Sequence, residues 1–353
     1  MELTPIKVRG KRRLGNEAVV ATPKKKSKTV GKSKLHKSRR SRESKASYLE
    51  KIPLEILERI LWYSENVNLP RSSPLIGRLL SGRSTLRETF IVAFQPTWDA
   101  WFGCVGDRND STRPTEGNPD FQSGLLEYPW TNISFILESW DFYVRRLAKA
   151  QRSGTDQPFH FQHVRIWGDP DNPANIMAKD DSNVVDSQEA SRCFFHDYAA
   201  FRAIEEHNGY YLRTFRNRSI QSTFLQVHKD TRIPDSLFTS PHSDEKIQKL
   251  FWLVRGGARL SPDQTWELTL QSFRDAVPET LPHVGKVNIT MIRLLYILGA
   301  YQTWPEYVSN DETGRMYSAQ LRCIRDPTAG IEDEYEYIIG MMSRGNSARM
   351  AGP

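Results

Sequence analysis

The stretch that decides the fold is residues 48–94, YLEKIPLEILERILWYSENVNLPRSSPLIGRLLSGRSTLRETFIVAF. Pro53 suits the first position of a helix, because its φ angle is preset and it has no N–H group to satisfy. Aliphatic side chains then recur at helical spacing in two rows, which are Leu54, Leu57 and Leu61, and Ile56 with Ile60. This spacing predicts a helix with a broad apolar stripe.

Two shorter helices are predicted after a break at residues 66–70. Ser73 is placed to cap a helix over residues 74–80, and Ser84 is placed to cap another over residues 85–94. The first of these two helices has an apolar stripe of its own, made of Leu75, Ile76, Leu79 and Leu80.

The two stripes have two interpretations. A helix of about a dozen residues is marginal by itself in water, so the stripes must pack either on the protein's own core or on a partner. We favour a partner surface, because the Pro-x-Glu opening follows directly after a charged tail. The predicted partner-binding residues are Ile52, Pro53, Leu54, Ile56, Leu57, Ile60, Leu61, Leu75, Ile76, Leu79 and Leu80.

The same segment resembles the F-box, whose opening reads Leu-Pro-x-Glu-Ile/Leu-x-x-x-Ile-Leu. The matching residues are Ile52, Pro53, Glu55, Ile56, Ile60 and Leu61. The run NLPRSSPLIGRLL that follows is similar to a large group of fungal F-box-like proteins. The resemblance implies a three-helix module over residues 48–95 that binds the Skp-like adaptor of SCF ubiquitin ligases. It also implies that the rest of the chain recruits a client protein and that other subunits transfer ubiquitin.

Residues 1–47 are expected to form a disordered basic tail. Residues 1–45 hold sixteen Lys and Arg against three Glu, whereas the rest of the chain holds 33 basic and 39 acidic side chains. The tail has too few apolar side chains to offset the entropy of folding. Its two basic clusters resemble a bipartite nuclear localisation signal and consist of Arg12, Arg13, Lys24, Lys25, Lys26 and Lys28. They predict a nuclear import receptor as a partner and a nuclear location, with the cytoplasm as an additional one.

The chain after the module is predicted to be mainly helical, so the fold class is mainly α with a minor α+β character. Residues 96–122 read as a linker, residues 123–342 as a helical body, and residues 343–353 as a disordered tail. The predicted helices of the body cover residues 132–151, 191–207, 243–255, 261–273, 288–301 and 332–342. One or two short strands are predicted, at residues 159–167 and 219–227.

We find no pattern typical of an enzyme, a metal site or a cofactor site. The three cysteines lie far apart, and no phosphate loop, dinucleotide fingerprint or nucleophile motif is present. His160 and His163 would point to opposite faces of a strand. The acidic loop of Asp169, Asp171, Asp180 and Asp181 reads as solvated. The longest apolar run, residues 294–300, is far shorter than a membrane span.

Two functional hypotheses therefore remain. The first is an F-box-type adaptor that presents a client protein, whose identity the sequence leaves open. The second is a nuclear interaction protein whose basic tail contacts nucleic acid or acidic partners. We favour the first over nucleic acid, because no aromatic residue before Tyr48 could stack on a base.

Overall fold

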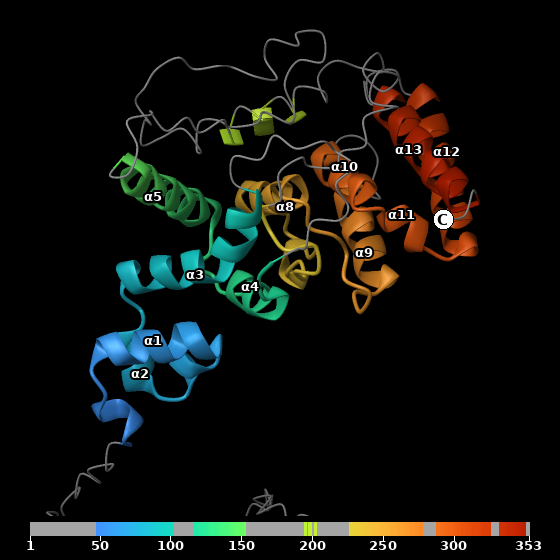
Figure 1. Cartoon of the computed structure of the whole chain (residues 1–353). Coiled ribbons are helices and arrows are strands. Elements are labelled where there is room, and N and C mark those ends of the chain that lie inside the picture. Colours follow the sequence, from blue (N-terminus) through green and yellow to red (C-terminus); the bar gives the residue numbers. More distant parts are fainter. Residues whose placement is uncertain are drawn as a thin grey trace, which may run out of the picture. The chain divides into compact units, whose positions relative to one another are not determined.

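A computed structural model describes residues 47–101, 116–152, 194–195, 197–199, 201–202, 226–277, 287–325 and 332–350. The described residues form helices and connecting turns, with no strand among them, which confirms a mainly helical fold (Figure 1). Of the two predicted strands, residues 159–167 lie outside the described residues. The described end of the other, Gln226 and Val227, is a bend.

The N-terminal elements are, in order, η1 (Leu49–Lys51), α1 (Leu54–Ser64), η2 (Leu69–Arg71), α2 (Pro74–Leu79), α3 (Arg83–Trp101), α4 (Pro119–Leu126) and α5 (Ile133–Arg152). The C-terminal elements are η5 (Asp235–Leu237), α8 (Asp244–Arg255), α9 (Trp266–Ala276), α10 (Ile289–Ile297), α11 (Ala300–Thr303), α12 (Glu306–Arg325) and α13 (Glu332–Met350). The described residues among 194–202 are also helical.

Polar side chains begin several of these helices, as predicted at Ser73, but Ser84 does not cap α3, which already begins at Arg83. The Ser73 hydroxyl accepts a hydrogen bond from the N–H of Leu75 at the start of α2, and Ser243 caps α8 in the same way. Asn118 and Asn288 cap α4 and α10 through their side-chain oxygens. Each cap satisfies backbone donors that have no partner within the helix.

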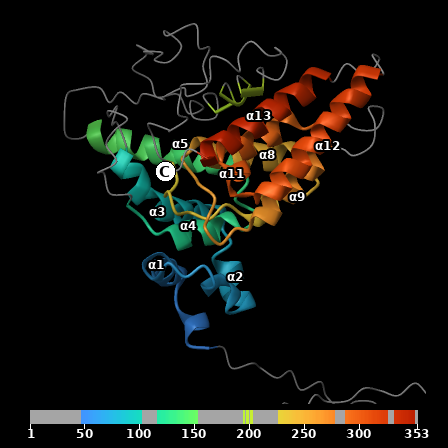
Figure 2. The same ribbon diagram turned by 90° about the vertical axis from the view of Figure 1, so that its right-hand side faces the viewer.

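The described helices bury two separate hydrophobic clusters. The small cluster consists of Leu57, Leu61, Leu69, Ile76 and Leu80, all from α1, η2 and α2 or the turn after α2. The large cluster extends from α3 and α5 through α8 to α13. Helix α8 contacts both α5 and α10 and is central to the large cluster (Figures 1 and 2).

Aromatic side chains fill both ends of the large cluster. On α3, the rings of Phe90 and Phe94 stack with centroids 4.2 Å apart, and Trp98 meets Trp140 of α5 edge-on at 4.8 Å. At the C-terminal end, Trp304 packs edge-on against Tyr301 with centroids 4.9 Å apart. Such edge-on and offset pairs add to the stabilisation that the buried area provides.

Helix α3 corrects the predicted boundary between module and linker at residue 95. It continues through Pro96 to Trp101, and Phe90, Phe94 and Trp98 are all fully buried in the large cluster. A proline inside a helix removes one backbone hydrogen bond and disturbs its neighbours. Here the side chain of Gln122 donates a hydrogen bond to the carbonyl of Ala93 at 3.0 Å, so this carbonyl has a partner despite the proline.

Further predictions about boundaries also need correction. Residues 119–122, assigned to the linker, belong to α4, because Asn118 caps a helix there. Residues 343–350, assigned to a disordered tail, continue α13, and no proline interrupts this stretch. The predicted helix over residues 288–301 is divided in two at Gly299, whose φ of +73° lies in the left-handed region. Helix α12 had no counterpart in the prediction.

Several predicted features lie outside the described residues. These are the basic tail to residue 46, its nuclear localisation clusters, His160, His163 and the acidic loop of residues 169–181. Among the described residues, no helix combines the length and apolar character that crossing a bilayer requires.

Candidate functional site

Helix α1 has three faces with different surroundings. Leu57 and Leu61 point into the small cluster and are 0% and 4% exposed. Glu58 and Trp62 point towards α3, where they bond to Thr85 and Thr89. The third face carries Ile56, Arg59, Ile60 and Tyr63, which follow the i, i+3, i+4, i+7 spacing of one helix face.

Four predicted partner-binding residues are buried, which corrects the prediction that they form a partner surface. Leu57, Leu61, Ile76 and Leu80 fill the small cluster together and are not available to a partner. The physical reason is that α1 and α2 are short and must first bury a stripe against each other. Ile52, Leu54, Ile60 and Leu79 pack around this cluster and are partly buried.

The remaining predicted residues lie on the surface. Ile56 is 43% exposed, Leu75 is 39% exposed, and Pro53 is also exposed. Tyr63, which the sequence analysis missed, is 87% exposed and lies on the same face as Ile56. Its position seven residues after Ile56 was the available signal. We call Ile56, Ile60 and Tyr63 of α1, with Leu75 and Leu79 of α2, the outer rows.

The small cluster is held against the body by specific contacts. The indole N–H of Trp62 donates to the Thr89 hydroxyl at 3.0 Å, and the Tyr128 hydroxyl donates to the Val67 carbonyl at 2.6 Å. A Cβ atom on Gly124 would lie 2.8 Å from a methyl carbon of Val67. Glycine at this position therefore allows the turn after α1 to approach α4 closely.

The charges around the outer rows are of both signs. Arg59 and Arg78 are exposed, and neither has an ion-pair partner in the described part of the chain. Glu50 of η1 accepts hydrogen bonds from the Ser73 hydroxyl and from the backbone N–H of Ser47. The bond from Ser73, followed by that from Ser47, lowers the pKa of this carboxyl group. Glu50 therefore joins η1 to the start of α2.

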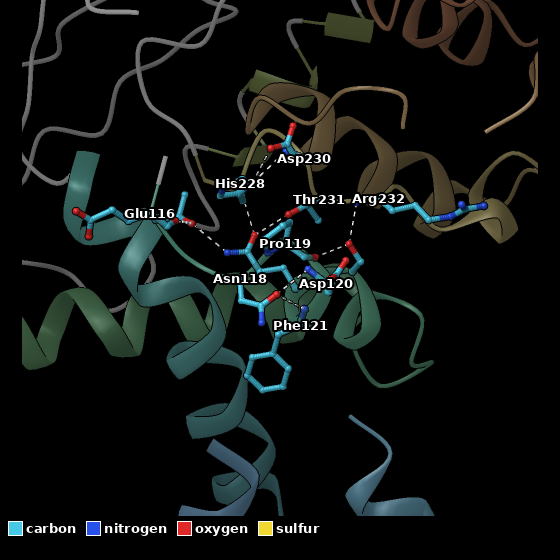
Figure 3. Close-up of polar contacts among 12 residues, drawn as sticks. Glu116, Asn118, Pro119, Asp120, Phe121, His228, Asp230, Thr231 and Arg232 are labelled. Atoms are coloured by element: carbon cyan, nitrogen blue, oxygen red, sulfur yellow. Dashed lines mark hydrogen bonds and ion pairs between the residues drawn. The ribbon is translucent and has the colours of Figure 1, made fainter. Parts of the chain in front are cut away.

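A second group of polar residues surrounds Gln122 between α3, α4 and the segment before η5. The Gln122 amide donates to the Ala93 carbonyl and the Thr97 hydroxyl, and its oxygen accepts from the His228 N–H and the Thr231 hydroxyl. Figure 3 shows this region, in which the backbone N–H of Arg232 also donates to Ser123. All four hydrogen-bonding positions of the amide are used within the chain. This arrangement fits a structural role rather than a ligand site.

Several charged groups are buried in the body, among them the Asp197–Arg255 pair and Lys249. Asp197 is 0% exposed, and its Oδ2 accepts a hydrogen bond from the Arg255 Nε–H at 2.8 Å and lies 2.8 Å from Arg255 Nη2 in the same ion pair. Lys249 donates to the Leu126 carbonyl at 2.8 Å and to the Thr131 hydroxyl at 3.0 Å. Burial lowers the pKa of Lys249 to about 8. The Lys249 ammonium and Oδ2 of Asp197 are bound by the chain itself, whereas the buried Oδ1 of Asp197 accepts no hydrogen bond within the described residues. The described residues contain no cluster of potential metal ligands.

Comparisons with known proteins add no relative. No family model, no curated protein and no solved structure matches the chain. The outer rows are therefore the best candidate site on the geometry and exposure of their own residues.

Proposed function

We propose that the chain is an F-box-type adaptor that binds a Skp-like subunit through the outer rows. In this proposal the body binds a client protein, and other subunits of the ligase transfer ubiquitin. The proposal is supported by one observation above all. The small cluster is already filled by its own four leucines and Ile76, and Ile56, Tyr63 and Leu75 are nevertheless left exposed.

The size of the outer rows sets how strong such binding can be. Complete burial of a fully exposed large apolar side chain contributes about 1.5–3 kcal/mol. Ile56 and Leu75 are only 43% and 39% exposed and would each contribute less than half of this, while Tyr63 at 87% has more left to bury. Association itself costs on the order of 4–15 kcal/mol. The apolar side chains alone therefore do not give tight binding, and the partner must also contact the charged rim, for which Arg59 and Arg78 are available.

Co-purification of the full chain with a Skp-like adaptor tests this proposal. We expect Ile56→Asp and Leu75→Asp to abolish co-purification, because each places a charge in the apolar contact while leaving the small cluster intact. Leu57→Asp is unsuitable, since it would disrupt that cluster. The control is Leu321→Asp, which changes an exposed leucine on α12 (58% exposed, against 39% for Leu75) and should bind normally. Retention of binding by both outer-row variants would refute the proposal.

We also propose nuclear import through the two basic clusters of the tail, on the basis of the sequence alone. Replacement of Lys24, Lys25 and Lys26 by alanine should move a fluorescent fusion of the full chain from the nucleus to the cytoplasm. Replacement of Lys32, Lys34 and Lys37 removes the same charge outside the bipartite pattern and serves as the control. An unchanged distribution of the first variant would exclude this signal.

A further inference from the structure

Helix α12 carries a second exposed apolar face, far from the outer rows in the sequence. Tyr307, Tyr317, Leu321 and Ile324 are 65%, 50%, 58% and 48% exposed. With 100° of rotation per residue, all four fall within an arc of about 100°. The opposite side of α12 carries the buried residues Val308, Met316 and Ala319, which belong to the large cluster.

The spacing along this face is that of a coiled-coil seam. Tyr307, Asn310, Gly314, Tyr317, Leu321 and Ile324 alternate at three and four residues, the a and d positions of a heptad. Helix α13 contacts α12, and in Figures 1 and 2 α12 lies at the outer edge of these two helices. The apolar side chains of this seam are exposed, so within the described part of the chain the seam face of α12 is open to a further helix.

We propose that this face pairs with α12 of a second copy of the chain, antiparallel and about a twofold axis. The seam is complementary to itself in this orientation. Tyr317 of one copy lies opposite Gly314 of the other, and a Cβ atom at Gly314 would meet nothing within 4 Å. The open space at Gly314 therefore accommodates the large ring of Tyr317. Tyr307 lies opposite Ile324 at both ends, as twofold symmetry requires.

The charges beside the seam favour the same orientation. Asp311 near the start of α12 and Arg322 near its end lie on the same flank, and both are exposed. The Arg322 guanidinium bonds only to the Ser318 carbonyl, and neither side chain has an ion-pair partner within the described residues. Antiparallel pairing in this register brings Asp311 of each copy to within about two residues of the level of Arg322 of the other, on the same side of the interface, so opposite charges face each other there. In this register Asn310 of one copy lies opposite Leu321 of the other, and this polar side chain in the seam lowers the stability of the pair.

The buried area indicates a weak dimer. The four exposed side chains would remove on the order of 400 Å² per copy from water, about half the area of a standard interface. We therefore expect a monomer–dimer equilibrium with a dissociation constant in the micromolar range rather than a permanent dimer.

Sedimentation velocity of the full chain over a hundredfold range of concentration tests the inference. We expect the sedimentation coefficient to rise with concentration, and Leu321→Asp to weaken the dimer at least tenfold. Leu75→Asp, an apolar-to-acid change on α2, should leave the equilibrium unchanged. A monomer at every concentration, or a dimer that Leu321→Asp does not affect, would overturn the proposal.

A charge exchange distinguishes the antiparallel pair from general adhesion of apolar surfaces. Asp311→Arg and Arg322→Asp should each weaken the dimer several-fold, because each places two like-charged pairs across the twofold axis. The double variant should have a dissociation constant within about threefold of that of the unmodified chain, since both charge pairs are attractive again. Failure of the double variant to recover would exclude this orientation. Circular dichroism of each variant verifies that the helices remain folded.

Discussion

Ile56 and Leu57 are consecutive residues of α1, yet Ile56 is 43% exposed and Leu57 is completely buried. One residue of rotation on the helix separates a surface that a partner could contact from the interior of the small cluster. Substitutions at these two positions should therefore have different effects, although both side chains are aliphatic and similar in size.

We expect Leu57→Ala to destabilise the small cluster by about 2–5 kcal/mol, because it leaves a cavity among Leu61, Ile76 and Leu80. Ile56→Ala should cost less than about 1 kcal/mol, because its side chain is half in water already. Hydrogen exchange of the α1 amides measures both. Equal losses of protection would contradict the assignment of the two faces.

Gln122→Leu should destabilise the protein by several kcal/mol, because it leaves the Ala93 carbonyl, the His228 N–H and the Thr231 hydroxyl without this partner. A buried polar group that loses its partner costs about 1–3 kcal/mol. Chemical denaturation measures the effect on the free energy of unfolding. Gln271→Leu is the control, since its amide bonds only to Asp275 at the surface, and a similar loss there would contradict the role of Gln122.

Asp197→Ala should cost about 3–5 kcal/mol, because it leaves the buried guanidinium of Arg255 without its carboxylate. The double variant Asp197→Leu with Arg255→Met removes both charges and should regain most of this loss. Thermal unfolding of the single and double variants tests the prediction. If the double variant is no more stable than Asp197→Ala, the loss does not come from an unpaired buried charge.

Because of Lys249, the free energy of unfolding should depend on pH at alkaline pH. The pKa of Lys249 is about 8 in the folded protein and near 10.5 when exposed, so between these values the unfolded chain binds more protons. The free energy of unfolding should therefore rise with pH across this window, by up to about 3 kcal/mol.

Denaturant titrations at roughly pH 7.5 and pH 9.5 measure this rise. This range lies below the titration of Tyr143 and Tyr301, whose pKa values are raised by burial. Lys249→Met has no ammonium group to desolvate and should lose the rise. A rise of the same size in Lys249→Met would show that another group causes it.

Much of the helical fold is predictable from local signals. The caps at Ser73 and Ser243 and the apolar rows of α1 and α5 specify their helices within a few residues. The predicted helix ends at residue 94, whereas α3 continues through Pro96 to Trp101, although proline usually ends a helix. The sequence does not reveal that the side chain of Gln122, distant along the chain, donates a hydrogen bond to the Ala93 carbonyl in the turn before Pro96.

Helix α12 escaped prediction for a different reason. It carries apolar residues on two opposite faces, with Met316 and Ala319 buried and Tyr317 and Leu321 exposed. Two such rows, separated by polar residues, cancel the single-sided periodicity that identifies an amphipathic helix.

The candidate site was predictable only in part. The sequence indicates that α1 is apolar over much of its circumference, but not which row meets α2. That division depends on tertiary contacts, such as the bond from Trp62 to Thr89 that orients α1 on α3. Ile56 and Leu75 were predicted and are exposed, whereas Leu57 and Leu61 were predicted and are buried.

Helix α3 joins α1 to the large cluster. Thr85 and Thr89 in its first half bond to α1, and Phe94 and Trp98 in its second half lie in the body. Its 19 residues make a rod about 28 Å long. A subunit bound to α1 would therefore be connected to the body by a continuous helix and not by a flexible linker. The length of α3 would then fix the distance between this subunit and a client protein bound to the body. Inserting or removing helical turns in α3 would change that distance.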